Sequence, residues 1–279
     1  MLRSFLLLLM LAIVHRGFSQ FYYTDLVSGA QSTLQYKALK TNLVKSMTAQ
    51  SFEKDGEQTP RFALNQTISA NFSQVETNTT SPSGEVSISK SFYKGLRLER
   101  NEDSSARIST VTTYRYQADG RPGSITAVTR DAGRGYSSEE VHEWQYQADG
   151  KPSGMLKIKD KKDTTVVTFT YDDQGNVAEE RWSRAGNITE TWYYYYNSKK
   201  QLTDIVRYNS RARRMLPDYL FEYDAAGRVT QMTQITAGSS NYLVWKYVFS
   251  TEGLKQRDMC YNKQQQLVGR IEFKYVMDR

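Results

Sequence analysis

The sequence predicts an all-β fold: an antiparallel meander of successive hairpins that forms an extended, curled sheet, with one N-terminal amphipathic helix. Two observations support this prediction. A turn motif recurs along the chain, and its aromatic anchors from Tyr116 to Phe249 lie 30, 25, 25, 27 and 26 residues apart. On the strands that enter these turns, aromatic residues alternate with polar ones, so each strand has one apolar and one polar face. A period of about 25 residues accommodates two strands and two turns, which indicates a repeated hairpin unit.

The chain of 279 residues begins with a segment, residues 1–19, that has the composition of a signal peptide. Arg3 supplies a positive start, residues 5–14 form an apolar run, and small residues precede Gln20 at the expected cleavage site. We therefore expect export to the periplasm, the cell surface or the medium. The apolar run is too short to span a bilayer and no later run is long and apolar enough, so no membrane span is predicted.

Residues 20–43 form the next predicted unit, an N-terminal helical segment. Asp25 can cap a helix, and we expect the helix itself at about residues 31–42. Apolar side chains recur at helical spacing from this helix into the residues after it, at Leu34, Ala38, Leu39, Leu43 and Met47. Strand-like sequence begins near Val44, and residues 44–279 are assigned to one β-repeat domain whose clearest repeats span residues 92–279.

Each repeat is centred on a turn, best seen in residues 223–229. The aspartate accepts a hydrogen bond from a backbone N–H two residues on, and the glycine takes a left-handed conformation that creates a bulge. Structural turn roles are therefore assigned to Asp119, Gly120, Asp149, Gly150, Asp172, Gly175, Asp224 and Gly227. In two repeats the outgoing strand carries Pro122 or Pro152, which lack an N–H and predict a bulge or a local sheet edge.

The strands that enter the turns carry a large apolar residue at every second position. The clearest series are Val167, Phe169 and Tyr171; Trp192, Tyr194 and Tyr196; Tyr219, Phe221 and Tyr223; and Trp245, Tyr247 and Phe249. An apolar face of this extent does not remain in water. The sheet must therefore curl on itself, be covered by the helical segment, or contact a partner.

The run Tyr-Asp-x-x-Gly-(Arg/Asn)-(Leu/Val), present at residues 171–177 and 223–229, resembles the signature of YD repeats in the Rhs and teneurin families. The resemblance covers about residues 92–279 and suggests a short, exported bacterial member. It implies a spiralling β-sheet shell, which in the long bacterial proteins encloses a toxic cargo. The present chain is far shorter and has no Asp-Pro-x-Gly self-cleavage core, so the cargo function does not carry over.

Few residues are suited to catalysis or metal binding. The chain has one cysteine, Cys260, and His142 is its one histidine beyond residue 19. A zinc site of the His/Cys kind needs three or four such ligands, so no metal site is expected, and no cofactor motif is present. His142 shares a strand face with Trp144 and Tyr146, and we interpret it as a member of the aromatic series. We therefore predict that the protein is not an enzyme and has no catalytic residues.

Three other functions are compatible with parts of the sequence. A glycoside hydrolase would need two converging carboxyl groups, but Glu139-Glu140, Asp172-Asp173 and Glu179-Glu180 are adjacent pairs that point to opposite faces of a strand. An outer-membrane barrel fits a signal peptide with alternating strands, but the polar face is too charged. A role as an accessory to a toxin-delivery system rests on the Rhs resemblance alone.

We predict an exported binding or structural module for a glycan or a protein. Trp192, Tyr194 and Tyr196 continue the aromatic series, so Tyr193 and Tyr195 fall on the face that is polar elsewhere. These two tyrosines could form a stacking platform for a sugar ring or a partner; packing beneath a loop is the alternative. The net charge of +7 is scattered, and its densest cluster, residues 211–214, is interpreted as a solvated hairpin tip, so no nucleic-acid partner is predicted. The sequence leaves the oligomeric state open.

Overall fold

The computed structural model describes residues 20–209, 212–235 and 241–278, so the expected signal segment lies outside the described residues. Over the described residues the chain forms a helical segment, made of a π-helical stretch (Tyr22–Val27) and α1 (Ser28–Thr41), followed by eighteen strands. The strands are β1 (Val44–Glu53), β2 (Ala63–Ile68), β3 (Gln74–Thr80), β4 (Val86–Lys94), β5 (Arg97–Ser105), β6 (Ile108–Tyr116), β7 (Pro122–Asp131), β8 (Tyr136–Tyr146), β9 (Pro152–Lys159), β10 (Asp163–Tyr171), β11 (Val177–Arg184), β12 (Asn187–Tyr196), β13 (Leu202–Asn209), β14 (Arg214–Tyr223), β15 (Val229–Ile235), β16 (Tyr242–Phe249), β17 (Lys255–Tyr261) and β18 (Leu267–Met277).

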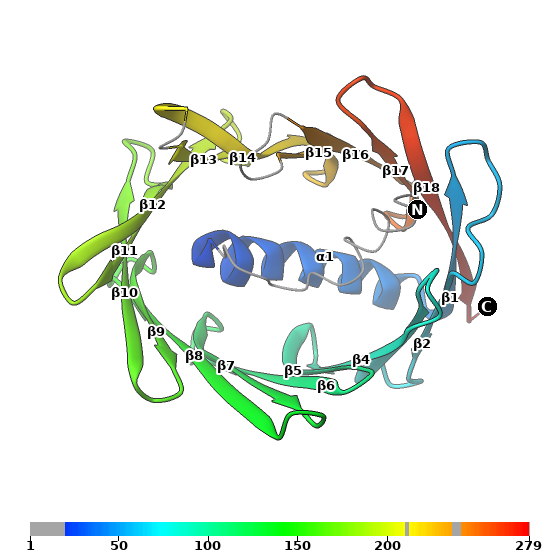
Figure 1. The fold of residues 1–279 in the computed structure, drawn as a ribbon, viewed down its shortest axis with the longest axis horizontal. Coiled ribbons are helices and arrows are strands. Elements are labelled where there is room, and N and C mark those ends of the chain that lie inside the picture. Colours follow the sequence, from blue (N-terminus) through cyan, green and yellow to red (C-terminus); the bar gives the residue numbers. More distant parts are fainter. Residues whose placement is uncertain (1–19, 210–211, 236–240, 279) are drawn as a thin grey trace.

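The strands form one closed barrel (Figure 1). Each strand pairs antiparallel with the next along the chain, and β1 closes the sheet by pairing with both β2 and β18. At the closure, Ala49 lies opposite Phe273 on one side and Leu64 on the other. The predicted antiparallel meander is confirmed, but the predicted extended, curled sheet is wrong because the sheet closes. Closure removes both sheet edges and turns the apolar face of every strand toward a common interior.

The aromatic face of the repeats lines this interior, the lumen of the barrel. One residue on each of β8, β10, β12 and β14 shows its burial, with exposed fractions of 3% for Trp144, 8% for Phe169, 0% for Trp192 and 4% for Phe221, while the tyrosines that end these strands are partly buried. Together with Phe21 of the helical segment they belong to one apolar cluster. The sequence left open whether the aromatic face is covered by closure of the sheet, by the helical segment or by a partner. In the structure two of these occur together, because the sheet closes on itself and the helical segment covers part of the face.

The helical segment lies within the ring of strands, and in Figure 1 it runs from the wall near β10 and β11 to β1. A single N-terminal helix is confirmed, but it begins at Tyr22 instead of near residue 31. Asp25 does not cap it and lies inside the π-helical stretch. The early turns form because their N–H groups find an acceptor in the wall, as described below. No helix among the described residues is long and apolar enough to cross a membrane.

The apolar stripe predicted for α1 is only partly correct. Leu34 is 57% exposed, and the one buried residue of α1 is Tyr36, which the stripe did not include. The Tyr36 ring stacks on Tyr93 of β4 with centroids 3.7 Å apart, and its hydroxyl donates to the carbonyl of Phe72. Ala38 and Leu39 of the predicted stripe pack against the same cluster as Tyr36. A wide barrel contacts a single helix on part of its surface only, which leaves Leu34 exposed.

The turns have the geometry that the sequence suggested. In the turn at residues 223–229, the Gly227 N–H donates to the Asp224 carbonyl at 3.1 Å, and Asp224 Oδ1 accepts from the N–H groups of Ala226 and Arg228 at 3.0 and 2.9 Å. Gly227 has φ +81°, and the strand register shifts beside Tyr223, as in a glycine bulge. The other assigned glycines also have positive φ: Gly120 at +90°, Gly150 at +91° and Gly175 at +79°. The other assigned aspartates each accept a nearby backbone N–H, at Asp119, Asp149 and Asp172. Register shifts also occur opposite Pro122 and Pro152.

Two kinds of side-chain contact link neighbouring repeats. In five repeats the tyrosine that ends the incoming strand donates its hydroxyl to a carbonyl of the preceding repeat: Tyr116 to Leu98, Tyr146 to Pro122, Tyr171 to Pro152, Tyr196 to Val177, and Tyr223 to Leu202. The cation after a turn glycine packs over the next aromatic ring, as Arg121 does over Tyr146 at 4.4 Å and Arg228 over Phe249 at 4.7 Å. These contacts explain why tyrosine and arginine recur with the turn.

Replacement of Tyr223 by phenylalanine tests the tyrosine hydrogen bond between neighbouring repeats. The change removes the 2.6 Å hydrogen bond to the Leu202 carbonyl and keeps the ring, so the free energy of unfolding is expected to fall by about 1 kcal/mol. Denaturant titration measures it. Tyr195→Phe is the matched control, because that side chain is 52% exposed. Equal stability of the two variants would exclude a role for the hydroxyl.

Candidate functional site

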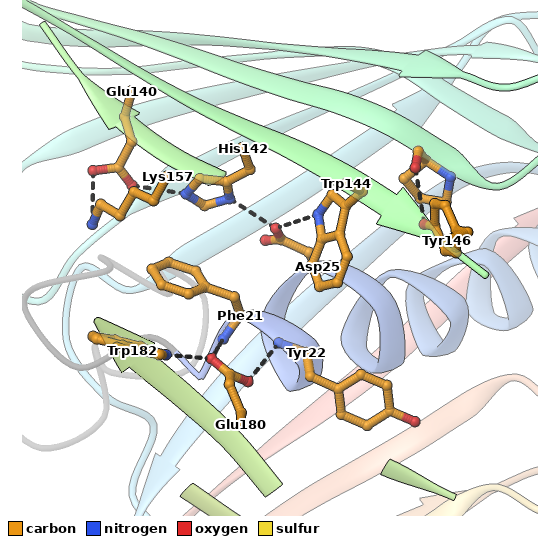
Figure 2. A network of polar contacts seen from close by, with 11 residues as sticks. Phe21, Tyr22, Asp25, Glu140, His142, Trp144, Tyr146, Lys157, Glu180 and Trp182 are labelled. Carbon is orange, nitrogen blue, oxygen red and sulfur yellow. Dashed lines mark hydrogen bonds and ion pairs between the residues drawn. The ribbon is translucent and has the colours of Figure 1, made fainter. Parts of the chain in front are cut away.

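The helical segment meets the barrel wall in a network of polar contacts (Figure 2). Its first centre is Glu180 on β11, which is fully buried. Two wall residues hold this carboxylate: the Trp182 indole N–H donates to Oε1 and the Tyr194 hydroxyl to Oε2, each at 2.6 Å. Two backbone N–H groups of the segment complete it, Phe21 to Oε1 and Tyr22 to Oε2, each at 2.9 Å. Each carboxylate oxygen thus accepts one hydrogen bond from the wall and one from the segment.

Strand alternation places Glu180 in the lumen. Glu180 and Trp182 face inward, whereas the adjacent Glu179 faces outward and forms an ion pair with Arg181. The first N–H groups of a helix lack partners within the helix, and a carboxylate satisfies them. Burial raises the pKa of Glu180, and its four hydrogen bonds oppose that shift because they favour the charged form.

The second centre is His142 on β8. Its Nδ1 lies 2.7 Å from Oδ2 of Asp25, and its Nε2 lies 3.1 Å from Oε1 of Glu140. Lys157 on β9 holds the other Glu140 oxygen at 2.9 Å, and the Trp144 indole N–H donates to Asp25 at 3.0 Å. Because a carboxylate faces each ring nitrogen, both nitrogens donate and the ring is an imidazolium.

The pKa values of His142 and Glu140 follow from the same contacts. Burial by itself would lower the pKa of His142, but the carboxylates of Asp25 and Glu140 outweigh it and raise the pKa to about 9. Burial would raise the pKa of Glu140, but hydrogen bonds from His142 and Lys157 outweigh it and lower the pKa to about 2. Both groups are therefore charged across the neutral range, and the ion pairs tie the segment to β8.

These shifts predict how the stability of the fold depends on pH. The His142 contribution is fully present below its ordinary pKa of 6.5 and is lost as the pH rises through about 9, whereas the Glu140 contribution is present above 4.5 and is lost as the pH falls through about 2. The free energy of unfolding is expected to be highest between pH 4.5 and 6.5 and to fall by roughly 3 kcal/mol above pH 9. Docking of the segment weakens by the part of this loss that the Asp25 contact supplies. Denaturant titration across this range measures the total, and hydrogen exchange of residues 20–41 measures the docking part. His142→Gln should abolish the alkaline loss; an unchanged pH profile in that variant would assign the loss to another group.

Aromatic contacts complete the site, one for each residue at the start of the segment. The Phe21 ring stacks on Trp182 with centroids 4.6 Å apart and packs against the edge of His142 at 4.8 Å. Tyr22 contacts Phe169 and Tyr194, with centroids 6.2 and 5.2 Å away, and Tyr23 contacts Tyr219 and Phe221 at 5.9 and 5.3 Å. Three successive side chains of the segment thus enter aromatic surroundings on the wall.

The residues singled out for ligand stacking lie elsewhere. Tyr193 and Tyr195 are on β12 with Trp192 and Tyr194, but on the outer face of the sheet, and Tyr195 is 52% exposed. Tyr193 lies opposite Val206 of β13. A hollow of about 540 Å³ is lined by residues of β4, β5 and β6: Lys94, Arg97, Glu99, Tyr114, Arg115 and Tyr116.

Sequence reasoning missed the lumenal network. It identified His142 as a member of an inward face, but not its partner Asp25, which lies 117 residues away in the chain. Two signals pointed to the network: the aromatic run Phe21-Tyr22-Tyr23 ahead of the predicted helix, and Glu180 as a lone carboxylate on the inward face of β11. Within the part of the chain that the structure describes, no three His, Cys, Asp or Glu side chains are grouped to hold a metal.

No family model and no curated protein match this sequence. Among solved structures, the chain is similar to a porin-like protein from Bacteroides uniformis, with 10% identity and a TM-score of 0.35 over 84% of this chain and 98% of that one. A porin-like protein from Bacteroides vulgatus has 11% identity and a TM-score of 0.28 over 84% and 98%. The TcdB2–TccC3 structure has 9% identity and a TM-score of 0.30, and the match covers 84% of this chain but 17% of that chain. These likenesses do not place the chain in a family, and the YD-repeat resemblance is not confirmed.

Proposed function

We propose that the protein is an exported, non-enzymatic barrel that binds a glycan or a protein on its outer face, around Tyr193 and Tyr195. The observation that carries the proposal is the pair of out-of-phase tyrosines on a face that elsewhere carries exposed charges such as Arg115, Glu143 and Lys246. Export rests on the composition of residues 1–19. The wall behind these tyrosines is occupied by the helical segment, so the outer face is the side open to a ligand.

The neighbours of the two tyrosines extend the surface. On β13, Tyr208 is 57% exposed, and its partner on β14, Met215, is 39% exposed. Asp204 lies opposite Tyr195 on β13 and adds a carboxylate to this face. An aromatic ring accepts the C–H face of a sugar or an apolar side chain, while a neighbouring carboxylate can accept hydrogen bonds from hydroxyl or amide groups.

The carboxylates favour this non-enzymatic reading over a glycoside hydrolase. Glu180 has all its hydrogen-bonding positions filled, and Asp172 accepts from the backbone of its own turn. Asp25 and Glu140 approach each other, but the imidazole of His142 lies between them and bonds to both. That ring occupies the place where a glycosidic bond would have to sit.

The distribution of apolar and polar side chains between the two faces of the barrel is the reverse of the one that a lipid environment requires. A barrel in a membrane alternates apolar side chains outward. Here the alternating aromatic series lines the lumen, and the outer positions between its members are mostly polar. A role as an accessory to toxin delivery has no residue in its favour beyond the repeat motif.

A glycan array and a pull-down on the chain without residues 1–19 test the proposal. For any ligand so identified, Tyr193→Ala with Tyr195→Ala is expected to weaken binding at least tenfold, because aromatic anchors dominate binding surfaces. Tyr136→Ala is the matched control, since Tyr136 is 51% exposed on another part of the barrel. Unchanged affinity in the double variant would remove this surface from consideration, and silence in both screens would favour a structural role.

A further inference from the structure

We propose that the lumenal wall around Glu180 and His142 is a peptide-binding site, which residues 20–41 fill in this chain and which the same segment of a second copy can fill in its place. The ligand class is a peptide at the start of a helix, with three successive aromatic residues and an aspartate two positions later. In this chain that pattern is Phe21-Tyr22-Tyr23-Thr24-Asp25. The inference is independent of the outer face around Tyr193 and Tyr195.

The barrel closes without the segment. Every strand pairs with two neighbours, and the closing pairings of β1 with β2 and β18 involve no residue before Val44. The segment adds no rung to the sheet. It reaches the wall through side chains and through two N–H groups, as a bound peptide does.

The wall organises both polar centres by itself. Trp182 and Tyr194 hold Glu180 so that each carboxylate oxygen keeps one position for an incoming N–H group. Lys157 and Glu140 hold His142 so that Nδ1 faces the place of an incoming carboxylate. Groups fixed in advance by their own neighbours are typical of binding sites, because little ordering remains to be done when the ligand arrives.

Burial is concentrated at the start of the segment. Phe21 is fully buried, and Gln20 before it is 3% exposed. Further along, Leu34 is 57% exposed, and Tyr36 is the one buried residue of α1. A segment that served only to fill the core would bury an apolar stripe along its length. Here the polar contacts with Glu180 and His142 and three aromatic contacts lie within residues 21–25, and α1 adds the Tyr36 contact before it reaches β1.

The connection to β1 explains why the site is filled in cis. Asn42 and Leu43 are the only residues between α1 and β1, so a released segment stays close to its own lumen. A short tether gives an effective concentration of the order of millimolar, which excludes dilute competitors. Exchange with a second copy therefore requires that the tether be cut or that the cis contacts be weakened.

The experiment uses the chain from residue 20 onward with a protease site inserted between Asn42 and Leu43. After cleavage, a synthetic peptide of residues 20–41 with a fluorophore at its carboxyl end is added. We expect saturable binding of the labelled peptide to the cleaved barrel, and displacement of the labelled peptide by unlabelled peptide. The matched control peptide carries Phe21→Ala and Asp25→Ala and is expected to bind at least 100-fold more weakly. Equal uptake of the two peptides, or no uptake while the cut barrel stays folded by circular dichroism, would overturn the proposal.

Loss of folding after cleavage would also overturn it, because the segment would then be part of the core and not a ligand. An uncut variant covers the case in which the insertion itself prevents folding. Asp25→Ala removes the contact with His142 and is expected to admit the labelled peptide and to form dimers by exchange of segments, whereas the parent chain admits neither. No uptake and no dimer in a folded Asp25→Ala variant would contradict the proposal as well.

Discussion

Replacement of Phe21 by alanine is expected to weaken docking of the helical segment by about 3–5 kcal/mol. This is the range for truncating a buried aromatic side chain. Phe21 is fully buried between Trp182 and His142, and the wall cannot close over the missing ring because both neighbours are held by hydrogen bonds. The measurement is hydrogen exchange of the amides of residues 20–41, which reports opening of the segment separately from unfolding of the strands.

Leu34→Ala is the control for this prediction. It lies in the same segment and also loses a large apolar side chain, but it is 57% exposed, so an effect of at most about 0.5 kcal/mol is expected. Similar exchange in both variants would show that the segment is held along its whole length and not by its first residues.

Replacement of Glu180 by alanine is expected to lower the free energy of unfolding by about 3–5 kcal/mol, because removing one partner of a buried, hydrogen-bonded charge leaves the others unpaired. Four donors would lose their acceptor: the Trp182 indole, the Tyr194 hydroxyl and two backbone N–H groups of the segment. Denaturant titration followed by tryptophan fluorescence measures the change, since Trp182 contacts the site directly.

The adjacent glutamate provides the comparison. Glu179→Ala removes the same side chain one residue earlier on β11, where it forms a partly exposed ion pair with Arg181, and such pairs contribute less than about 1 kcal/mol. Glu180→Gln separates shape from charge, because the amide keeps the size of the side chain but turns one acceptor into a donor that faces other donors. A Glu180→Gln variant as stable as the parent would mean that the carboxylate is protonated in the fold and already donates.

Local pattern in the sequence predicted the strands and the side on which their residues lie. The alternation at residues 192–196 places Trp192 and Tyr194 inward and Tyr195 outward, and the structure has the same arrangement. The same rule separates Glu179 from Glu180. The turn at residues 223–229 was also predictable, since an aspartate and a glycine at fixed positions determine its hydrogen bonds and backbone angles.

The helix shows where local pattern was insufficient. Its predicted start near residue 31 followed from apolar spacing, but Tyr22 begins the observed segment because Glu180, more than 150 residues away, accepts its N–H. Leu34 was expected to be buried and Tyr36 was not singled out, since the stacking of Tyr36 on Tyr93 depends on where β4 lies in the barrel.

The repeat, the hairpins and the apolar face of the strands follow from residues that are neighbours in the chain. Three features depend on the assembled fold instead: the closure of the sheet through β1 and β18, the passage of the helical segment through the lumen, and the pairing of Asp25 with His142 and of Glu180 with Phe21. Each of these joins parts of the chain that lie more than 100 residues apart. Their partners are chosen by the shape and by the buried charges of the assembled barrel, which no local period of the sequence encodes.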